Sequence, residues 1–150
     1  MESPQNHIWG PNLWIILHSL AEKIGTTKNL PSEETRLWSG FLSSLRYSLP
    51  CPQCKKHYTK YYIDNKISSI SDIRMWLYNL HNDVNMKTDK KNITIEEISE
   101  LYNKPFHFTH HFSIILNQMM HSLKIGWNKH DDIQRTIRLS NQIKYFYDLF

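Results

Sequence analysis

The chain carries both of its cysteines in the stretch LPCPQC, residues 49–54, where Pro50 and Pro52 stand on either side of Cys51. Proline suits the first position of a helix, so we expect a helix to begin at Pro52, just after Cys51. A residue that precedes proline is disfavoured in helical geometry, so the preceding helix must end before Pro50. Three kinds of chemistry remain open for Cys51 and Cys54: a metal site, a structural disulfide, or a redox pair.

The metal and structural interpretations both lack support elsewhere in the sequence. Structural zinc takes four ligands, usually with a second cysteine pair, and the chain has no further cysteine. A zinc site would use Cys51, Cys54 and His57, and its fourth ligand would have to fold back from a distant cluster, His107, His110 and His111. A disulfide that closes so short a loop removes little entropy from the unfolded chain.

The redox interpretation has a direct physical mechanism. Unpaired backbone N–H groups and the positive end of the helix dipole stabilise a thiolate at a helix start. Such a thiolate is a nucleophile, and a partner one turn along can close the disulfide. Thioredoxin-like proteins place this pair after a βαβ start, which this sequence does not show, so the electrons must pass to another group.

Composition and charge place the chain among globular proteins. Its 150 residues suit one domain plus an appendage, and 40% hydrophobic with 13% aromatic residues argue against disorder. The net charge is +4, but the basic residues are scattered, so nucleic acid is not an expected partner. We see no signal-peptide pattern and no apolar run of the ~20 residues that a membrane span needs, and expect a cytoplasmic protein.

Helical periodicity runs through the whole sequence, while alternating strand patterns are poor. Thr94 begins a capping-box pattern with a glutamate three residues on, which predicts a short helix. We therefore predict an all-α fold with a five-helix core and a two-helix tail. The first predicted helix contains the apolar stripe Trp14–Ala21 and stops near Gly25. The second runs from residue 31 to just before residue 50, and the third begins at residue 52. The remaining helices are predicted at about residues 71–84, 94–103, 106–124 and about 131–150.

Polar residues interrupt the apolar stripes of two predicted helices. His81 and Asn85 are four residues apart and share a helix face. Taken alone, they fit a helix end that faces water, and His18 fits an interior imidazole with a hydrogen-bond partner. No GxGxxG motif can be formed from the four glycines, Gly10, Gly25, Gly40 and Gly126, so a Rossmann-type cofactor site is not expected.

Three motifs in this order resemble the Erv/ALR family of FAD-linked sulfhydryl oxidases. They are WGPNLWIILH at residues 9–18, LPCPQCKKHYTKY at residues 49–61 and HNDVNMKTDK at residues 81–90. The likeness covers about the first hundred residues and is greatest to members encoded by large DNA viruses. For such a member the location would be the host cytoplasm or the virion.

The resemblance implies a four-helix bundle plus a short fifth helix holding FAD. It assigns residues 1–104 to the oxidase core and residues 105–150 to a helical extension that packs on the core or on a dimer partner. Cys54 matches the cysteine nearest the flavin and Cys51 the outward one that meets thiol substrates. The positions that match cofactor contacts are Gly10, Trp14, His18, His57, His81, Asn82, Val84, Asn85, Lys87, Lys90 and Tyr102.

The sequence also departs from the family pattern. It has no cysteines for additional disulfides or for a shuttle pair, so electrons must come from a separate thiol protein, such as a thioredoxin-like donor, or from a small thiol. Thr88 and Asp89 replace the usual Leu-Gly, which leaves the local turn open. Family likeness further implies a homodimer and oxygen as electron acceptor, with hydrogen peroxide as product.

Two other functions remain compatible with the residues alone. One is a non-enzymatic helical adaptor, in which the aromatic stripes form the hydrophobic core and the tail is a partner-binding surface. The other is a zinc-binding module built on Cys51, Cys54 and His57. We expect no metal. The purified oxidase should be yellow and an adaptor colourless, whereas a zinc module should lose its structure to a chelator.

Overall fold

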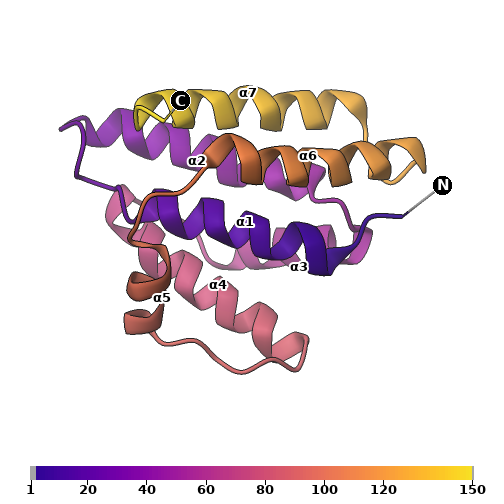
Figure 1. Ribbon diagram of the computed structural model, residues 1–150, viewed down its shortest axis with the longest axis horizontal. Helices are drawn as coiled ribbons and strands as arrows, with labels where there is room; N and C mark the ends of the chain where they lie inside the picture. The colour runs from indigo at the N-terminus through magenta and orange to yellow at the C-terminus, as the bar shows by residue number, and fades with distance from the viewer. Residues whose placement is uncertain (1–2, 150) are drawn as a thin grey trace.

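The computed structural model describes residues 3–149, and all of the regular secondary structure within them is helical (Figure 1). The predicted all-α fold is therefore confirmed. The elements are α1 (Asn6–Ala21), α2 (Pro31–Ser48), α3 (Pro52–Asp64), a 3-10 helix η1 (Ile70–Asp72), α4 (Ile73–Lys87), α5 (Ile95–Tyr102), α6 (Phe108–Lys124) and α7 (His130–Phe146).

Local signals account for several helix boundaries. Pro52 is the first residue of α3, and Thr94 caps α5 by accepting a hydrogen bond from the backbone N–H of Glu97. Two turns need glycine, because Gly25 after α1 and Gly126 after α6 have φ angles of 78° and 82°. The last helix ends earlier than predicted, at Phe146, and residue 150 lies outside the described residues.

The first four helices surround one apolar core. Trp38, Phe41 and Leu42 of α2 are fully buried, as are Ile16 of α1 and Leu77 of α4. In Figure 1, α4 and α5 lie on the side of the molecule opposite α7. This arrangement leaves α1 in the middle, with one face toward α4 and α5 and another toward α6.

The helices α6 and α7 pack against α1 and α2, respectively (Figure 1). Fully buried side chains of this hairpin, among them Ile115, Met119 and Ile133, belong to the same core cluster as those of α2. Gly40 lets α7 approach closely, since a Cβ atom there would lie 3.2 Å from Cδ2 of Leu139. The C-terminal helices thus share one core with the rest of the chain.

Buried polar contacts also join α7 to α2. The hydroxyl of Thr136 lies 2.7 Å from that of Ser48 and 3.0 Å from that of Ser44. Near the end of α7, the Tyr147 hydroxyl accepts a hydrogen bond from Trp38 Nε1 at 2.8 Å and donates one to the Glu34 carboxylate. Because buried polar groups are costly without partners, these contacts define one arrangement of the two helices.

Within residues 3–149, none of the helices has both the length and the apolar character that crossing a bilayer requires.

Candidate functional site

The two cysteines lie at the N-terminus of α3. Cys51 has an extended backbone with φ of −125°, and its sulfur accepts a hydrogen bond from the backbone N–H of Cys54 at 3.3 Å. Cys51 is thus the capping residue of the helix, and Cys54 lies in its first turn. Both thiols are free and partly buried. At this position the unpaired backbone N–H groups of the helix N-terminus point toward any negative charge that develops on the two sulfurs.

Asn6, at the start of α1, donates to both sulfurs. Its Nδ2 lies 3.6 Å from Sγ of Cys54 and 3.9 Å from Sγ of Cys51. Trp9 orients this amide, because its Nε1 donates to Oδ1 of Asn6 at 3.0 Å. Asn6 is 48 residues from Cys54 and belongs to no local motif, so the sequence alone does not mark it as a site residue.

The environment of Cys54 favours the protonated thiol. Burial, and next the neighbouring sulfur of Cys51, raise the pKa of Cys54 to about 12, while the hydrogen bond from Asn6 acts in the opposite direction. Cys54 therefore carries its proton at neutral pH when the pair is reduced. A hydrogen bond from Asn6 becomes stronger if that sulfur ionises, because charge-assisted hydrogen bonds are the stronger kind.

A large cavity opens beside the two cysteines. Its volume is about 1440 Å³, and its walls come from α1, α3, α4 and α5 and from the segment that leads into α6. Pockets for small ligands usually measure about 300–1,000 Å³, so this one has room for a dinucleotide-sized molecule. Both cysteines line it.

Four aromatic rings form a stacked cluster on one side of this cavity. The rings of Trp14 and His81 lie 4.0 Å apart and nearly parallel, and those of His18 and Tyr102 lie 4.7 Å apart. Nε2 of His18 is 2.8 Å from Nδ1 of His81, which joins the two stacks. The cluster presents flat apolar surface, which suits a flat heteroaromatic ligand.

Both histidines of this cluster are neutral at pH 7. Burial, and next the neighbouring His81, lower the pKa of His18 to about 3. Burial, and next the positive charge of Lys90, lower the pKa of His81 to about 4. One imidazole therefore donates the shared hydrogen bond and the other accepts it.

The C-terminal end of α4 brings lysines to the same cavity. Asp89 adopts the left-handed conformation, with φ of 58°, and the backbone N–H of Lys90 then bonds to the carbonyl oxygen of Asn85 at 2.7 Å. Aspartate tolerates this conformation better than most residues, so it can stand where glycine would otherwise be expected. Lys87 and Lys90 both line the cavity.

His57 is held by an acidic side chain. Its Nε2 lies 2.6 Å from Oδ2 of Asp83, and Nζ of Lys87 lies 3.7 Å from the same oxygen. This contact with Asp83 fixes the orientation of the imidazole. Across residues 3–149 no group of three or more His, Cys, Asp or Glu side chains is arranged to hold a metal ion.

The structure brings most of the predicted site residues to the cavity. Two of the predicted cofactor contacts stand apart: His18 lies behind the wall and holds His81, and the amide of Asn82 binds both backbone polar groups of Ile93 at 2.8 and 2.9 Å. Asn82 thus orders the loop before α5. The predicted site residues that line the cavity are Cys51, Cys54, Gly10, Trp14, His57, His81, Val84, Asn85, Lys87, Lys90 and Tyr102.

Residues after position 104 also line the cavity, and sequence reasoning did not place them there. Phe106, His107, His111 and Trp127 all contribute to the wall. His111 is tied to α1, since its Nδ1 lies 2.8 Å from Oδ1 of Asn12. No local pattern marks these residues, because contacts between segments that are distant in the sequence bring them to the site.

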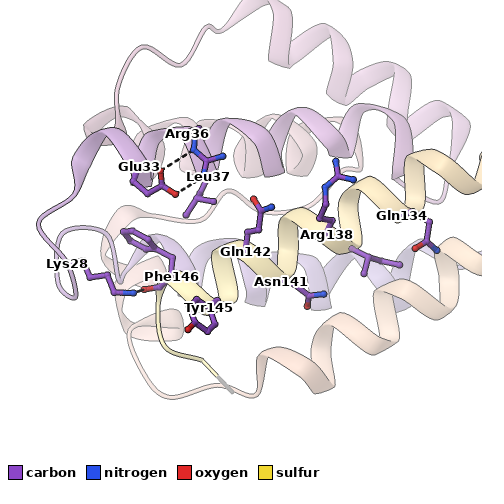
Figure 2. Close-up of a pocket in the computed structure, with 11 residues that line it drawn as sticks. Lys28, Glu33, Arg36, Leu37, Gln134, Arg138, Asn141, Gln142, Tyr145 and Phe146 are labelled. Atoms are coloured by element: carbon purple, nitrogen blue, oxygen red, sulfur yellow. Dashed lines mark hydrogen bonds and ion pairs between the residues drawn. The ribbon is translucent and has the colours of Figure 1, made fainter.

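A second cavity, of about 680 Å³, lies between α2 and α7 (Figure 2). It is lined mainly by long polar side chains, such as Gln134, Arg138 and Gln142, and Arg36 is already paired with Glu33. No sulfur and no stacked aromatic pair lines it. We therefore place the functional site at the larger cavity.

Comparisons with known proteins identify a family and relatives that this chain resembles. Residues 11–103 match the model of the Erv1/Alr family. The chain is similar to a "probable FAD-linked sulfhydryl oxidase" of Acanthamoeba polyphaga mimivirus, with 36% identity over 102 residues, which are 64% of this chain and 69% of that protein. It is also similar to the "FAD-linked sulfhydryl oxidase" of African swine fever virus (isolate Pig/Kenya/KEN-50/1950), with 29% identity over 99 residues, 64% of this chain and 81% of that one. No solved structure matches.

Proposed function

The chain belongs to the Erv1/Alr family, and we propose that it is an FAD-linked sulfhydryl oxidase that converts pairs of thiols into disulfides. The observation that carries this proposal is that Cys51 and Cys54 line the same cavity as the ring cluster around Trp14 and His81. A redox-active pair and a surface for a flat cofactor are the two parts that such an enzyme needs.

The residues that line the cavity fit FAD. Uncharged stacked rings at Trp14, His81 and Tyr102 suit the flat heteroaromatic parts of the cofactor. Lys87 and Lys90 suit its pyrophosphate, because ammonium groups form charge-assisted hydrogen bonds with phosphate oxygens. The chemistry supplied by bound FAD is a two-electron oxidation of the cysteine pair, with return of the electrons to oxygen as hydrogen peroxide.

The cysteine pair carries out the exchange with substrate. A substrate thiolate attacks Cys51 of the Cys51–Cys54 disulfide, so that a mixed disulfide forms and the sulfur of Cys54 leaves and takes up a proton. A second substrate thiol, losing its proton, then attacks the substrate sulfur of the mixed disulfide, and the sulfur of Cys51 leaves and takes up a proton. The substrate gains one disulfide and loses two electrons, and the protein pair becomes two thiols.

The surroundings of the pair assist both sulfurs. Nδ2 of Asn6 donates to each of them, which stabilises Cys54 when it leaves as a thiolate. The raised pKa of Cys54 returns it to the thiol form after substrate has been oxidised. Its proton must leave again before the pair gives up electrons, so we propose that this deprotonation is part of each turnover.

The source of the electrons lies outside the cysteine pair. The 150 residues hold no third cysteine, so we propose that a separate thiol protein, of the thioredoxin-like class, or a small thiol supplies the electrons. Homodimerisation and a cytoplasmic or virion location also stay predictions. Light scattering on the purified protein tests the first, and fractionation of producing cells tests the second.

A flavin spectrum and an oxygen-uptake assay test the proposed function. Protein purified without added cofactor should be yellow and contain FAD, and with dithiothreitol it should consume oxygen and release hydrogen peroxide. The Cys51→Ser variant should keep the colour and lose the oxygen uptake, because substrate then has no disulfide to attack. Colourless protein that also fails to bind added FAD would overturn the proposal.

A further inference from the structure

Trp127, in the turn between α6 and α7, lies close to the cysteine motif, because Nζ of Lys55 donates to its carbonyl oxygen at 2.6 Å. It lines the same cavity as Cys51 and Cys54 and keeps 40% of its surface exposed. It also lies beyond residues 11–103, the part that matches the family model. A partly exposed tryptophan that shares a cavity with the cysteine pair is a feature of this chain that the proposed chemistry does not use.

The turn that carries Trp127 is fixed to the backbone just before Cys51. Asn128 is buried, and its Nδ2 donates to the carbonyl oxygens of Ser48 and Leu49 at 2.9 and 3.3 Å. Those carbonyls end α2, immediately before Pro50. The position of the turn is therefore coupled to the segment that carries the reactive cysteine.

Lys55 fixes the same turn from the other side of the pair. Its Nζ donates to the carbonyl oxygen of Trp127 at 2.6 Å and to Oδ1 of Asn128 at 2.5 Å. Lys55 is one helical turn from Cys51, since its backbone N–H bonds to the Cys51 carbonyl oxygen at 2.9 Å. The turn is thus held on both sides of the cysteine motif.

These anchors hold the turn while leaving the indole accessible. Gly126 takes a left-handed conformation, and the backbone N–H of Trp127 then bonds to the Ser122 carbonyl oxygen at 2.8 Å. A rigid, partly exposed tryptophan is the type of side chain that most often dominates binding between polypeptides. The large apolar surface of the indole contributes most to binding free energy when another apolar side chain covers it.

We infer that Trp127 is a substrate-contact residue, which packs against an apolar side chain next to the attacking cysteine of a polypeptide dithiol. This inference rests on the proposed oxidase function, because the substrate must bring a sulfur to Cys51. A small dithiol has no side chain that reaches the indole. Trp127 therefore favours polypeptide substrates over small thiols.

Steady-state kinetics with three reductants test this inference. The reductants are dithiothreitol and two short synthetic peptides that share the sequence Cys-Gly-Ser-Cys, one flanked by Leu and Phe and the other by Ser and Gly. For Trp127→Ala, the ratio of kcat/KM for the apolar peptide to that for dithiothreitol should fall about fivefold or more, mainly through KM. Trp127→Phe should restore most of that ratio.

A matched control separates this contact from a general effect of losing an aromatic residue. Tyr145 is exposed, lies on α7 and does not line the cavity, so Tyr145→Ala should leave all three kcat/KM values unchanged. An unchanged ratio in Trp127→Ala, an equal fall for both peptides or a loss of FAD would overturn the inference. If wild-type protein oxidises no dithiol, the proposed function itself fails, whereas normal wild-type turnover with an unchanged ratio rejects only the role of Trp127.

Discussion

His18 and His81 meet through their ring nitrogens, with 2.8 Å between Nε2 of His18 and Nδ1 of His81. Burial keeps both rings neutral, with pKa values lowered from 6.5 to about 3 and about 4. The contact joins α1 to α4 behind the cavity wall. It also makes the fold sensitive to acid, because a proton added to either ring must be accommodated in a buried position.

Acid should weaken the folded state below about pH 6.5. The unfolded chain binds a proton at His18 there, while the folded chain does not until the pH approaches 3. The contribution of neutral His18 to the free energy of unfolding is therefore fully present above pH 6.5 and is lost as the pH falls. The slope from His18 is about 1.4 kcal/mol per pH unit within that window. Urea unfolding of the cofactor-free protein between pH 7 and pH 4 measures it.

A His18→Gln variant separates this effect from the titration of carboxylates. Glutamine can hydrogen-bond to His81 but does not bind a proton in this range, so the pH dependence of the free energy of unfolding should be shallower than in the wild type. The same slope in both proteins would show that His18 titrates normally in the folded state.

The two cysteines should differ in their reactivity toward alkylating reagents. Because the pKa of Cys54 is raised to about 12, its thiol should react slowly with iodoacetamide at pH 8. Cys51, as the capping residue outside the helix, should be modified first in the reduced protein. Mass spectrometry of peptides after timed alkylation measures the order, and faster modification of Cys54 would contradict the environment described for it.

Replacing Lys90 should weaken FAD binding. Its ammonium group lines the cavity and lies close enough to His81 to lower the pKa of that ring. In Lys90→Ala the Kd for FAD should rise about threefold to tenfold at low salt, since one charge-assisted contact is lost. The difference should shrink as salt is added, because screening weakens contacts at exposed charges.

Lys60→Ala is the control for this measurement. Lys60 is exposed, pairs with Asp64 at 2.6 Å and does not line the cavity. Fluorescence titration of cofactor-free protein with FAD should give the wild-type Kd for this variant. If both variants weaken binding equally, the effect comes from net charge and not from a contact at Lys90.

The hydroxyl of Tyr147 should contribute measurably to stability. In Tyr147→Phe, the indole N–H of Trp38 loses its acceptor and the buried carboxylate of Glu34 loses a donor. Leaving buried polar groups without partners should lower the free energy of unfolding by about 2–3 kcal/mol. Thermal unfolding followed by circular dichroism tests this, with Tyr145→Phe as an exposed control. An equal Tm for Tyr147→Phe and wild type would show that α7 is not held to α2 through this hydroxyl.

The sequence predicts the helices well where the signal is local. Pro52 and the capping box at Thr94 set helix starts from the residues next to them. The start of α1 at Asn6 has no such signal, and Pro11 lies inside that helix, where proline is uncommon. The turn after α4 was left open by the sequence because Asp89 takes a conformation in which glycine is more usual.

The site is less predictable, because spacing along a helix does not show which side of a wall a ring occupies. His18 lies behind His81 and Asn82 turns toward the loop at Ile93, although both are close in sequence to residues that line the cavity. Asn6 and Trp127 come to the cysteines through contacts between distant segments, and only the packed structure brings them there.

The anaerobic reaction of dithiothreitol with the yellow protein tests the central proposal. We propose that Cys54, which matches the family cysteine nearest the flavin, is the sulfur through which the pair delivers electrons to FAD. In wild-type protein the visible flavin band should disappear on addition of dithiothreitol. In Cys54→Ser, loaded with FAD to the same extent, the band should persist. Bleaching of Cys54→Ser at the wild-type rate would contradict the account.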